Sequence, residues 1–358
     1  MFNPSRLIVA RKRRKLTSKE LAEKVHVSPV TITRIEKGNN PPDPNTIDAI
    51  VSILGFPKEF FFGKDIDELT IDAVSFRSLT TMTAKEREAA LSAGELSYLF
   101  SDWVNEKFNL PKPDLISLAS YETEPSIAAR ILRDSWGLGE KPIPNMIKLL
   151  EAKGVRVFSL SENTKNVDAF SCWRSDIPYV FLNTFKSAEH SRFDAAHELG
   201  HLILHKHGGL KTKEIEREAN NFAASFLMPK MDVLSHIQSV ASLDQLKLAK
   251  KRWGVSISAL AHRLHKIEII SDWQYRMFCI QINKRGYRTN EPNEREREES
   301  IVWKKVLGEL WKERFTIKHI ASELHIPCSE IESLIFGLTH NNIAQNIQSK
   351  REHLKVVE

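Results

Sequence analysis

The stretch DAAHELGHLILHKHGG, residues 194–209, carries His197 and His201 four positions apart, with Glu198 next to the first histidine. Residues four apart lie on one face of an α-helix, so the two imidazoles can bind one metal ion. Glu198 would face a metal-bound water and act as general base while hydroxide attacks a carbonyl. The pattern H-E-x-x-H therefore indicates a site that uses Zn²⁺ to hydrolyse peptide bonds; the alternative is a helix that carries surface histidines.

The segment after this motif favours the zinc site. A catalytic zinc takes three protein ligands and leaves one position for water. The next predicted helix, EIEREANNFAASFLMP at 214–229, brings acidic side chains back towards the first. Its EAxxxF pattern resembles the ligand-bearing second helix of glutamate-type zincins, which implies Glu218 as the third ligand, with Glu214 one turn earlier as the alternative. Gly200 is unfavourable inside a helix and indicates that another element packs closely there.

Three runs with strand-like composition precede the motif: VRVFSL, AFSCW and YVFLN. The turn signal RSDIP separates the last two, so we expect a small three-stranded sheet. YVFLN, at 179–183, is predicted to be an edge strand that pairs with an extended peptide, with Tyr179 and Phe181 contacting the substrate. His205 continues the four-residue series, but it falls near the helix end. There a histidine commonly caps carbonyls, so we do not expect it to bind the metal.

The whole-chain composition bounds the class of protein. At 358 residues, with 41% hydrophobic and 27% charged residues, the chain can form two or three globular domains. The basic N-terminus does not resemble a signal peptide, and no apolar run approaches the roughly 20 residues of a membrane helix. The cysteines (Cys172, Cys279, Cys328) are three and far apart, which favours a reducing cytoplasm over disulfides or cysteine-held zinc.

The positive charge is concentrated at the N-terminus. Residues 1–62 contain eleven Lys and Arg against six Asp and Glu, a net +5 out of +6 for the chain. A basic surface confined to one small domain is typical of phosphate binding. The alternative is a merely solvated basic face.

A helix–turn–helix motif lies within this basic region. In LTSKELAEKVHVSPVTITRIEKGNNPP, residues 16–42, Thr17 and Glu20 form a predicted capping box, and Ser28 with Pro29 starts the second helix. His26, Val27 and Ser28 form the turn between the helices. The early exposed residues of such a second helix enter the major groove of DNA. The predicted DNA contacts are Ser18, Lys19, Ser28, Val30, Thr31, Thr33, Arg34 and Lys37.

This pattern closely resembles the XRE family, the lambda-repressor/Cro type of helix–turn–helix, over about 57 residues. The resemblance implies binding to a double-stranded DNA operator and dimerisation. One departure concerns the first helix of the motif, where the family commonly has glutamine and this chain has Ser18 and Lys19. A helical module for protein interaction is the alternative.

The metal motif resembles a second family. AAHELGHLILH followed by EREANNFAASFLMP is similar to the ImmA/IrrE metallopeptidases, over about residues 70 to 270. That resemblance implies a zincin-like fold, His197, His201 and an acidic residue of the next helix as metal ligands, and catalysis by Glu198. It also implies that the chain cleaves a repressor protein to relieve repression. A regulator whose zincin domain binds or senses without cutting is the alternative.

We therefore expect a multidomain protein: an all-α helix–turn–helix domain, an α+β zincin-like domain and a helical C-terminal region. The expected divisions are 1–63 for DNA binding, 64–152 for a helical connector and the start of the peptidase domain, 153–283 for the peptidase core, 284–300 for a charged linker and 301–358 for the C-terminal helices. Residues 300–338 have a helix–turn–helix rhythm, but Glu330 and Glu332 lie in the second helix. This favours a structural or dimerisation role over a second DNA contact.

Overall fold

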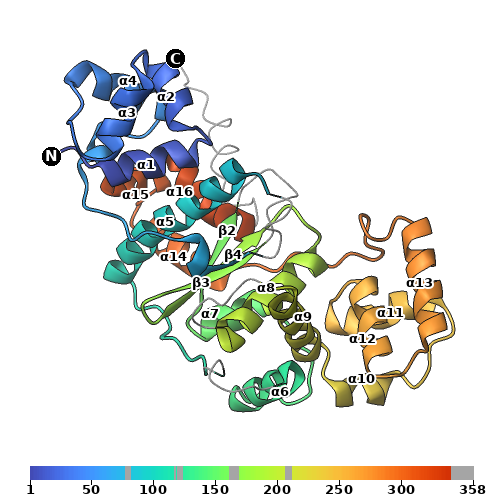
Figure 1. The fold of residues 1–358 in the computed structure, drawn as a ribbon. Coiled ribbons are helices and arrows are strands. Elements are labelled where there is room, and N and C mark those ends of the chain that lie inside the picture. Colours follow the sequence, from blue (N-terminus) through green and yellow to red (C-terminus); the bar gives the residue numbers. More distant parts are fainter. Residues whose placement is uncertain (77–81, 117, 119–123, 161–168, 206–211, 340–358) are drawn as a thin grey trace, which may run out of the picture.

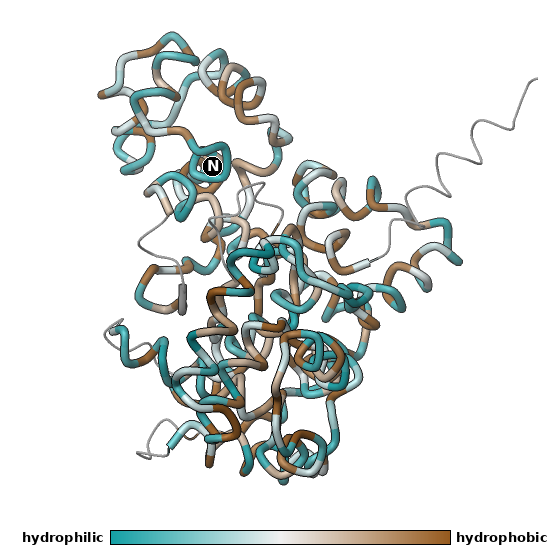
Figure 2. Tube along the Cα trace, turned by 90° about the vertical axis from the view of Figure 1, so that its right-hand side faces the viewer, coloured by the Kyte–Doolittle hydropathy of each residue, from teal (hydrophilic) through white to brown (hydrophobic). Residues whose placement is uncertain are grey.

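The computed structural model describes residues 1–76, 82–116, 118, 124–160, 169–205 and 212–339. Figure 1 shows an N-terminal helical domain, a central domain around a small sheet, and a group of helices at the other end of the molecule. The hydropathy trace in Figure 2 shows the N-terminal domain as a lobe above the remainder of the chain. The protein is therefore multidomain, as expected.

The N-terminal domain contains four α-helices and a 3₁₀ turn. These are α1 (Pro4–Arg13), α2 (Ser18–Val25), α3 (Pro29–Glu36), α4 (Pro44–Leu54) and η1 (Lys58–Phe62). The predicted capping box of Thr17 and Glu20 is present, and Ser28 caps α3. Gly55 ends α4 at φ 67°, a left-handed conformation that favours glycine. Leu7, Leu21, Ile32 and Ile50 are fully buried in the core of this domain.

The central sheet has the strand order β1-β3-β4-β2. Its strands are β1 (Val74–Phe76), β2 (Arg156–Leu160), β3 (Phe170–Arg174) and β4 (Ile177–Asn183). β4 pairs parallel to β2 and antiparallel to β3, and β1 pairs antiparallel to β3. Ser175 adopts φ 54° in the two-residue turn between β3 and β4, at the turn signal in the sequence.

This topology corrects two expectations. The three expected strands are present, but the short β1 adds a fourth beside β3. The prediction that residues 179–183 form an edge strand is wrong, because β4 lies between β3 and β2 with both edges paired. A buried apolar run does not reveal which strands will flank it, since that depends on segments distant in sequence.

Helices cover both faces of the sheet. The long helix α5 (Ala84–Lys107) packs on one face, where Tyr98 lies edge-on to Tyr179, with the ring centroids 5.0 Å apart. The helix α8 (Ala188–Leu204), which carries the histidines, packs on β3 and β4. α9 (Lys213–Leu227) lies against α8, with α6 (Pro125–Ser135) next to it (Figure 1).

The remaining helices extend the central domain. Residues 242–268 contain two helices, α11 (Leu243–Trp253) and α12 (Ile257–Lys266), separated at Gly254, whose φ is 62°. The helices not yet given are α7 (Met146–Ala152), α10 (Lys230–His236), α13 (Asp272–Lys284), α14 (Ile301–Lys312), α15 (Ile317–Leu324) and α16 (Cys328–Ile335), with the 3₁₀ turns η2 (Ile71–Ala73) and η3 (Phe336–Leu338).

The charge-dense segment after α13, interpreted from sequence as a linker, is anchored by buried charges. Glu298 is 6% exposed; one carboxylate oxygen pairs with Arg192 of α8. The other oxygen accepts the backbone N–H of Met146, at 2.7 Å, where α7 begins. Glu291 pairs with the buried Lys250 of α11 at 3.1 Å. This connection therefore fixes three helices of the central domain to one another.

The C-terminal helices join the central domain to the N-terminal one. Trp303 of α14 donates its indole N–H to the Val157 carbonyl of β2 at 2.7 Å. α16 packs on β2 and α5, and its Glu330 accepts from Arg13 at 2.6 Å and from Arg14 at 2.5 Å. In Figure 1 α15 and α16 lie directly beneath α1. These contacts support the structural role expected for this region.

Candidate metal centre and DNA-recognition helix

The helix that carries H-E-x-x-H begins after a serine that caps it. Ser187 caps α8 by accepting the backbone N–H of His190 at 3.2 Å. Gly200 lies where α9 crosses closely, since a Cβ at this position would be 3.0 Å from the ring of Phe222. The glycine that weakens an isolated helix thus allows the two helices to approach.

The side chains of His197, His201 and Glu216 converge on one point. The Nε2 atoms of the two histidines are 3.0 Å apart, and oxygens of Glu216 lie 3.3 Å from His197 and 3.5 Å from His201. One ligand atom from each of the three residues lies within 4.8 Å of the others. Tetrahedral zinc ligands at about 2.1 Å from the ion are roughly 3.4 Å apart, so this donor set fits zinc.

The third member of this group differs from the sequence expectation. Glu216 occupies the position, whereas Glu218 accepts from His205 at 2.8 Å and Glu214 pairs with Arg217 in solvent. The reason is the rotation of α9: its buried stripe runs through Ala219, Phe222, Ala223 and Phe226. Glu216 lies one turn before Ala219 on that stripe, a signal that the EAxxxF resemblance obscured.

The histidine pair is held by a second layer of side chains. Nδ1 of His205 lies 3.1 Å from Nδ1 of His201, and Nε2 of His205 lies 2.8 Å from Glu218. His205 also ends α8, as predicted, with its backbone N–H bonded to the His201 carbonyl. Partners of this kind orient a metal-binding imidazole and fix its tautomer. His205 and Glu218 are therefore positioning residues in this geometry.

The electrostatics of the group suit a cation. Burial by itself raises the pKa of the Glu216 carboxyl, but hydrogen bonds from His197 and His201 outweigh it and hold the pKa well below its ordinary value. A carboxylate that stays ionised beside two imidazoles can bind a divalent metal. Burial lowers the pKa of His205 in turn, which favours the neutral imidazole.

Glu198 is fixed by the sheet. The hydroxyl of Ser171, on β3, donates to one of its carboxylate oxygens at 2.7 Å. The strand beneath α8 thus orients the side chain of Glu198, which follows His197 in the sequence. Sequence reasoning missed Ser171, because nothing in AFSCW distinguishes a serine aimed at the helix from one aimed elsewhere.

The two residues predicted to contact substrate lie elsewhere. Tyr179 and Phe181 are both fully buried on the α5 face of the sheet. The Tyr179 hydroxyl donates to Ser101 of α5 at 3.0 Å, and the Phe181 ring stacks on Phe170, with the centroids 4.3 Å apart. Alternation along β4 directs them away from α8, so the substrate-binding prediction for both residues is wrong.

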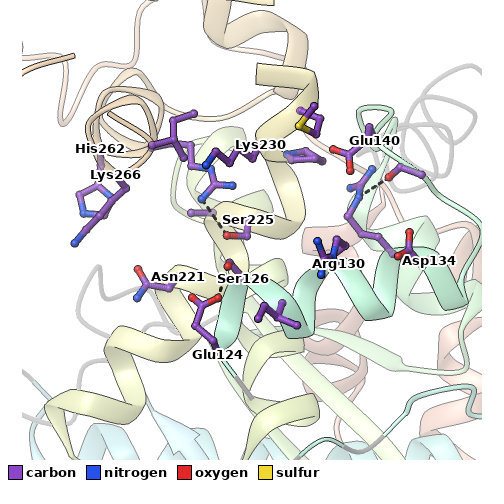
Figure 3. A pocket seen from close by; sticks show the side chains of 18 residues that line it. Glu124, Ser126, Arg130, Asp134, Glu140, Asn221, Ser225, Lys230, His262 and Lys266 are labelled. Carbon is purple, nitrogen blue, oxygen red and sulfur yellow. Dashed lines mark hydrogen bonds between the residues drawn. The ribbon is translucent and has the colours of Figure 1, made fainter. Parts of the chain in front are cut away.

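A cavity of about 760 Å³ opens beside the group formed by His197, His201 and Glu216, here called the metal group, and Glu216 is part of its lining. Its cationic side chains are Lys213, Arg217, Lys266 and Arg288. Across α9 lies another cavity, of about 520 Å³, between α6, α9 and α12 (Figure 3). His262, Lys266 and Asn221 border both cavities, but His197, Glu198, His201 and Glu216 do not line the second. Of these two cavities, the first is therefore the one whose lining includes a member of the metal group.

In the N-terminal domain, α3 presents its polar face to solvent. Val30, Thr33, Arg34 and Lys37 are exposed, and Thr31 is partly exposed. Lys19 is exposed on α2, while Ser18 donates to Glu36 at 2.8 Å. Ser28 is bonded to Thr31 as the cap of α3. The geometry leaves Val30, Thr33, Arg34 and Lys37 the most available for a groove.

Comparisons with known proteins match both parts of the chain. The family model described as a helix-turn-helix matches residues 7–61, and the model described as an IrrE N-terminal-like domain matches residues 150–265. No curated protein matches the chain. One similar solved structure is Bacillus thuringiensis PlcR in complex with the peptide PapR7 and DNA, 15% identical, covering 98% of this chain and 97% of that one. Its TM-score of 0.16 is too low to support any conclusion.

In the part of the chain that the structure describes, no helix is both long and apolar enough to cross a membrane. The helix–turn–helix match supports DNA binding, and the second match supports a domain of metallopeptidase type, in which the structure places the His–His–Glu group. The chain therefore joins an XRE-type helix–turn–helix domain to a domain of the IrrE N-terminal-like peptidase family.

Proposed function

We propose that this protein is a transcriptional regulator that binds a DNA operator and cleaves a protein with a zinc-dependent endopeptidase. The observation that carries the proposal is the convergence of His197, His201 and Glu216 beside a carboxylate, Glu198, that Ser171 holds in place. Zinc in this site would lower the pKa of a bound water and polarise the scissile carbonyl. The site acts in the cytoplasm, where the operator is found.

The roles of the protein groups follow from their positions. His197, His201 and Glu216 would hold the ion, with His205 and Glu218 orienting His201. Glu198 takes the proton of the attacking water on a carboxylate oxygen and passes it to the leaving amine. The Ser171 hydroxyl restricts the Glu198 carboxylate to one orientation, so the proton acceptor is already aligned when substrate binds.

A repressor protein is the substrate that best suits this arrangement. A DNA-binding domain on the same chain raises the local concentration of the peptidase near proteins bound to neighbouring DNA. The ImmA/IrrE resemblance implies the same class of substrate. We propose that the protein acts as a homodimer, as helix–turn–helix regulators of this type do.

A second candidate function rests on a specific observation. Glu198 is only 1% exposed and His197 is fully buried, so Glu216 is the member of the group that the cavity reaches. A general base buried to this extent is also what a regulator would have if its zincin domain bound metal without cutting. The two functions differ in whether new peptide termini arise.

The test compares cells that produce the wild type with cells that produce Glu198→Gln, by mass spectrometry of protein N-termini. Glu198→Gln removes the general base but no metal ligand, so it should retain zinc while cleavage falls by about 10²–10⁴-fold. A new terminus in a DNA-binding protein, present only with the wild type, is the expected result. Identical termini in both strains would establish the non-cleaving function.

Zinc content tests the ligand set separately. Glu216→Ala should lose zinc, while Glu214→Ala, which removes an exposed carboxylate of the same helix, should retain it. Glu218→Ala should weaken zinc binding by about 10–100-fold, because it acts through His205 and His201. If Glu218→Ala loses zinc and Glu216→Ala keeps it, the assignment of Glu216 is wrong.

A further inference from the structure

The strand β1 belongs to the connection between the two family-matched domains, yet it forms the edge of the sheet beside β3, the strand whose Ser171 bonds to Glu198. It pairs antiparallel with β3 in the register Val74–Cys172, Ser75–Ser171 and Phe76–Phe170. We propose that this edge of β3 is where an extended substrate peptide pairs, and that β1 covers it as an internal substitute for that peptide. The inference rests on the proposed peptidase function.

The register connects β1 to the chemistry. Ser171, the partner of residue 75, is the residue whose hydroxyl holds Glu198 at 2.7 Å. Neighbouring strands lie about 4.8 Å apart, so the β1 backbone is one strand spacing from the residue that orients the general base. The opposite edge of β3 is taken by β4, so β1 lies on the edge of β3 at which a peptide can add to the sheet.

The segment leading into β1 is pinned to the central domain. The backbone N–H of Leu69 donates to Glu95 of α5 at 3.1 Å. Leu69 packs so closely on Gly94 that a Cβ there would lie 2.5 Å from the leucine Cδ2. Asp67 accepts from Arg174, at the end of β3, at 2.6 Å. These contacts hold residues 67–74 across α5 and the sheet edge.

The covering strand can be exchanged. Its three paired residues are few for a strand, so a longer peptide with more backbone hydrogen bonds can replace it. The residues of β1 also indicate what kind of peptide would bind there. Val74 lies opposite Cys172 and is 3% exposed. The substrate is therefore expected to be an extended segment, antiparallel to β3, with a small aliphatic residue opposite Cys172.

The pairing of residue 74 with Cys172 allows a reversible disulfide, here called the lock, that would hold β1 on β3. Directly paired antiparallel residues have Cα atoms about 4.5–5.5 Å apart, within the range of a disulfide. Val74→Cys can therefore be oxidised onto the native Cys172, in a full-length protein with Cys279→Ser and Cys328→Ser. Burial raises the pKa of Cys172 to about 12, so the oxidation needs prolonged alkaline treatment. Val74→Cys combined with Cys172→Ser is the matched control that cannot lock.

The probe is a labelled synthetic peptide, TIDAVSFRSLT, with the sequence of residues 70–80. Binding is measured by fluorescence anisotropy with Glu198→Gln in every protein, so no hydrolysis is required. A protein with Val74→Gly, Ser75→Gly and Phe76→Gly should bind the probe at least about tenfold more tightly than one with native β1, since it removes an intramolecular competitor. The oxidised Val74→Cys protein should bind the probe more weakly than the protein with native β1. Reduction of its disulfide should restore the affinity of the protein with native β1.

Equal affinity for the probe in the locked, native and glycine-substituted proteins would overturn the inference. Hydrogen exchange of residues 169–174 provides a second measurement that does not depend on the folding of the glycine variant: exchange should slow in the oxidised lock and not in the control. Equal exchange in both would likewise overturn it. Neither measurement requires cleavage. If both give the expected result but the protein never cleaves a substrate, the proposed peptidase function is wrong and the inference about β1 still holds.

Discussion

Two helix pairs of this molecule have almost the same local construction and opposite uses. α2–α3 and α15–α16 each consist of two eight-residue helices. Each first helix ends at a histidine in the left-handed conformation, His26 at φ 59° and His325 at φ 54°. In both pairs a three-residue turn then leads into a helix with buried isoleucines. Short-range sequence therefore builds the same unit twice.

The second helices differ in what they present. α3 exposes Val30, Thr33, Arg34 and Lys37, whereas α16 buries Glu330 against Arg13 and Arg14 of α1. Burial raises the pKa of Glu330, but the two guanidinium groups outweigh it and hold the pKa below its ordinary value. A helix–turn–helix shape therefore does not indicate DNA binding unless its second helix remains exposed and basic.

The largest expected effect is on the contact between the pairs. Glu330→Gln leaves Arg13 and Arg14 without their carboxylate and should lower the free energy of unfolding by about 2–3 kcal/mol, less than a fully buried pair because Arg14 is partly exposed. Urea denaturation of the full-length protein measures it. Glu332→Gln, exposed on the same helix, is the control and should change stability by less than about 0.5 kcal/mol.

The same contact predicts a pH dependence. The folded-state pKa of Glu330 is depressed, so its stabilising effect is complete above the unfolded pKa of about 4.3 and is lost as the pH falls through the lower folded value. The difference in unfolding midpoint between wild type and Glu330→Gln should therefore be constant at pH 6–8 and shrink below about pH 4. A constant difference down to pH 3 would show that the charge of Glu330 is not involved.

DNA binding should separate the two pairs directly. Arg34→Ala with Lys37→Ala should weaken binding to operator DNA by roughly tenfold, about 1.4 kcal/mol, and reduce the salt slope by about 1 for each phosphate that the protein no longer neutralises. Lys318→Ala, an exposed lysine of α15, should change neither quantity. Equal effects from both changes would mean that α15–α16 also binds DNA.

The smallest effects concern the shared turn. A non-glycine residue in the left-handed region destabilises the folded state by about 1 kcal/mol. Glycine avoids this strain but loses more backbone entropy on folding, which offsets part of the gain. His26→Gly and His325→Gly should each raise the free energy of unfolding by about 0.5 kcal/mol, to similar extents, in thermal denaturation. A large loss of stability at only one of them would show that its imidazole has a further role.

Much of the architecture was predictable because its signals are local. The capping box at Thr17 and Glu20, the caps at Ser28 and Ser187, and the turn at Ser175 each involve residues within four positions of one another. The spacing of His197, Glu198 and His201 likewise follows from helix geometry alone. Gly200 was correctly interpreted as a point of close approach, although the sequence did not identify Phe222 as the residue that packs on it.

The predictions that were wrong all depended on packing between distant segments. Tyr179 and Phe181 were expected at the site, but β4 became a central strand and alternation turned both rings towards α5. Glu218 was expected beside His197 and His201, but the rotation of α9 against α8 brings Glu216 to the two histidines. Successive residues of an α-helix are about 100° apart around its axis, so Glu216 and Glu218 differ by about 200° and the orientation of α9 decides which of them faces the histidines.

Local patterns in the sequence specify the class of chemistry: two histidines and a glutamate on one helix, and a basic helix–turn–helix at the N-terminus, because periodicity fixes which side chains share a face. Which residues those faces contact depends on the tertiary structure. It brought Glu216 to the histidines, Ser171 to Glu198, Glu330 to α1 and β1 to the edge of β3. These contacts join residues far apart in the chain, and their geometry depends on how whole helices and strands pack, which no local pattern specifies.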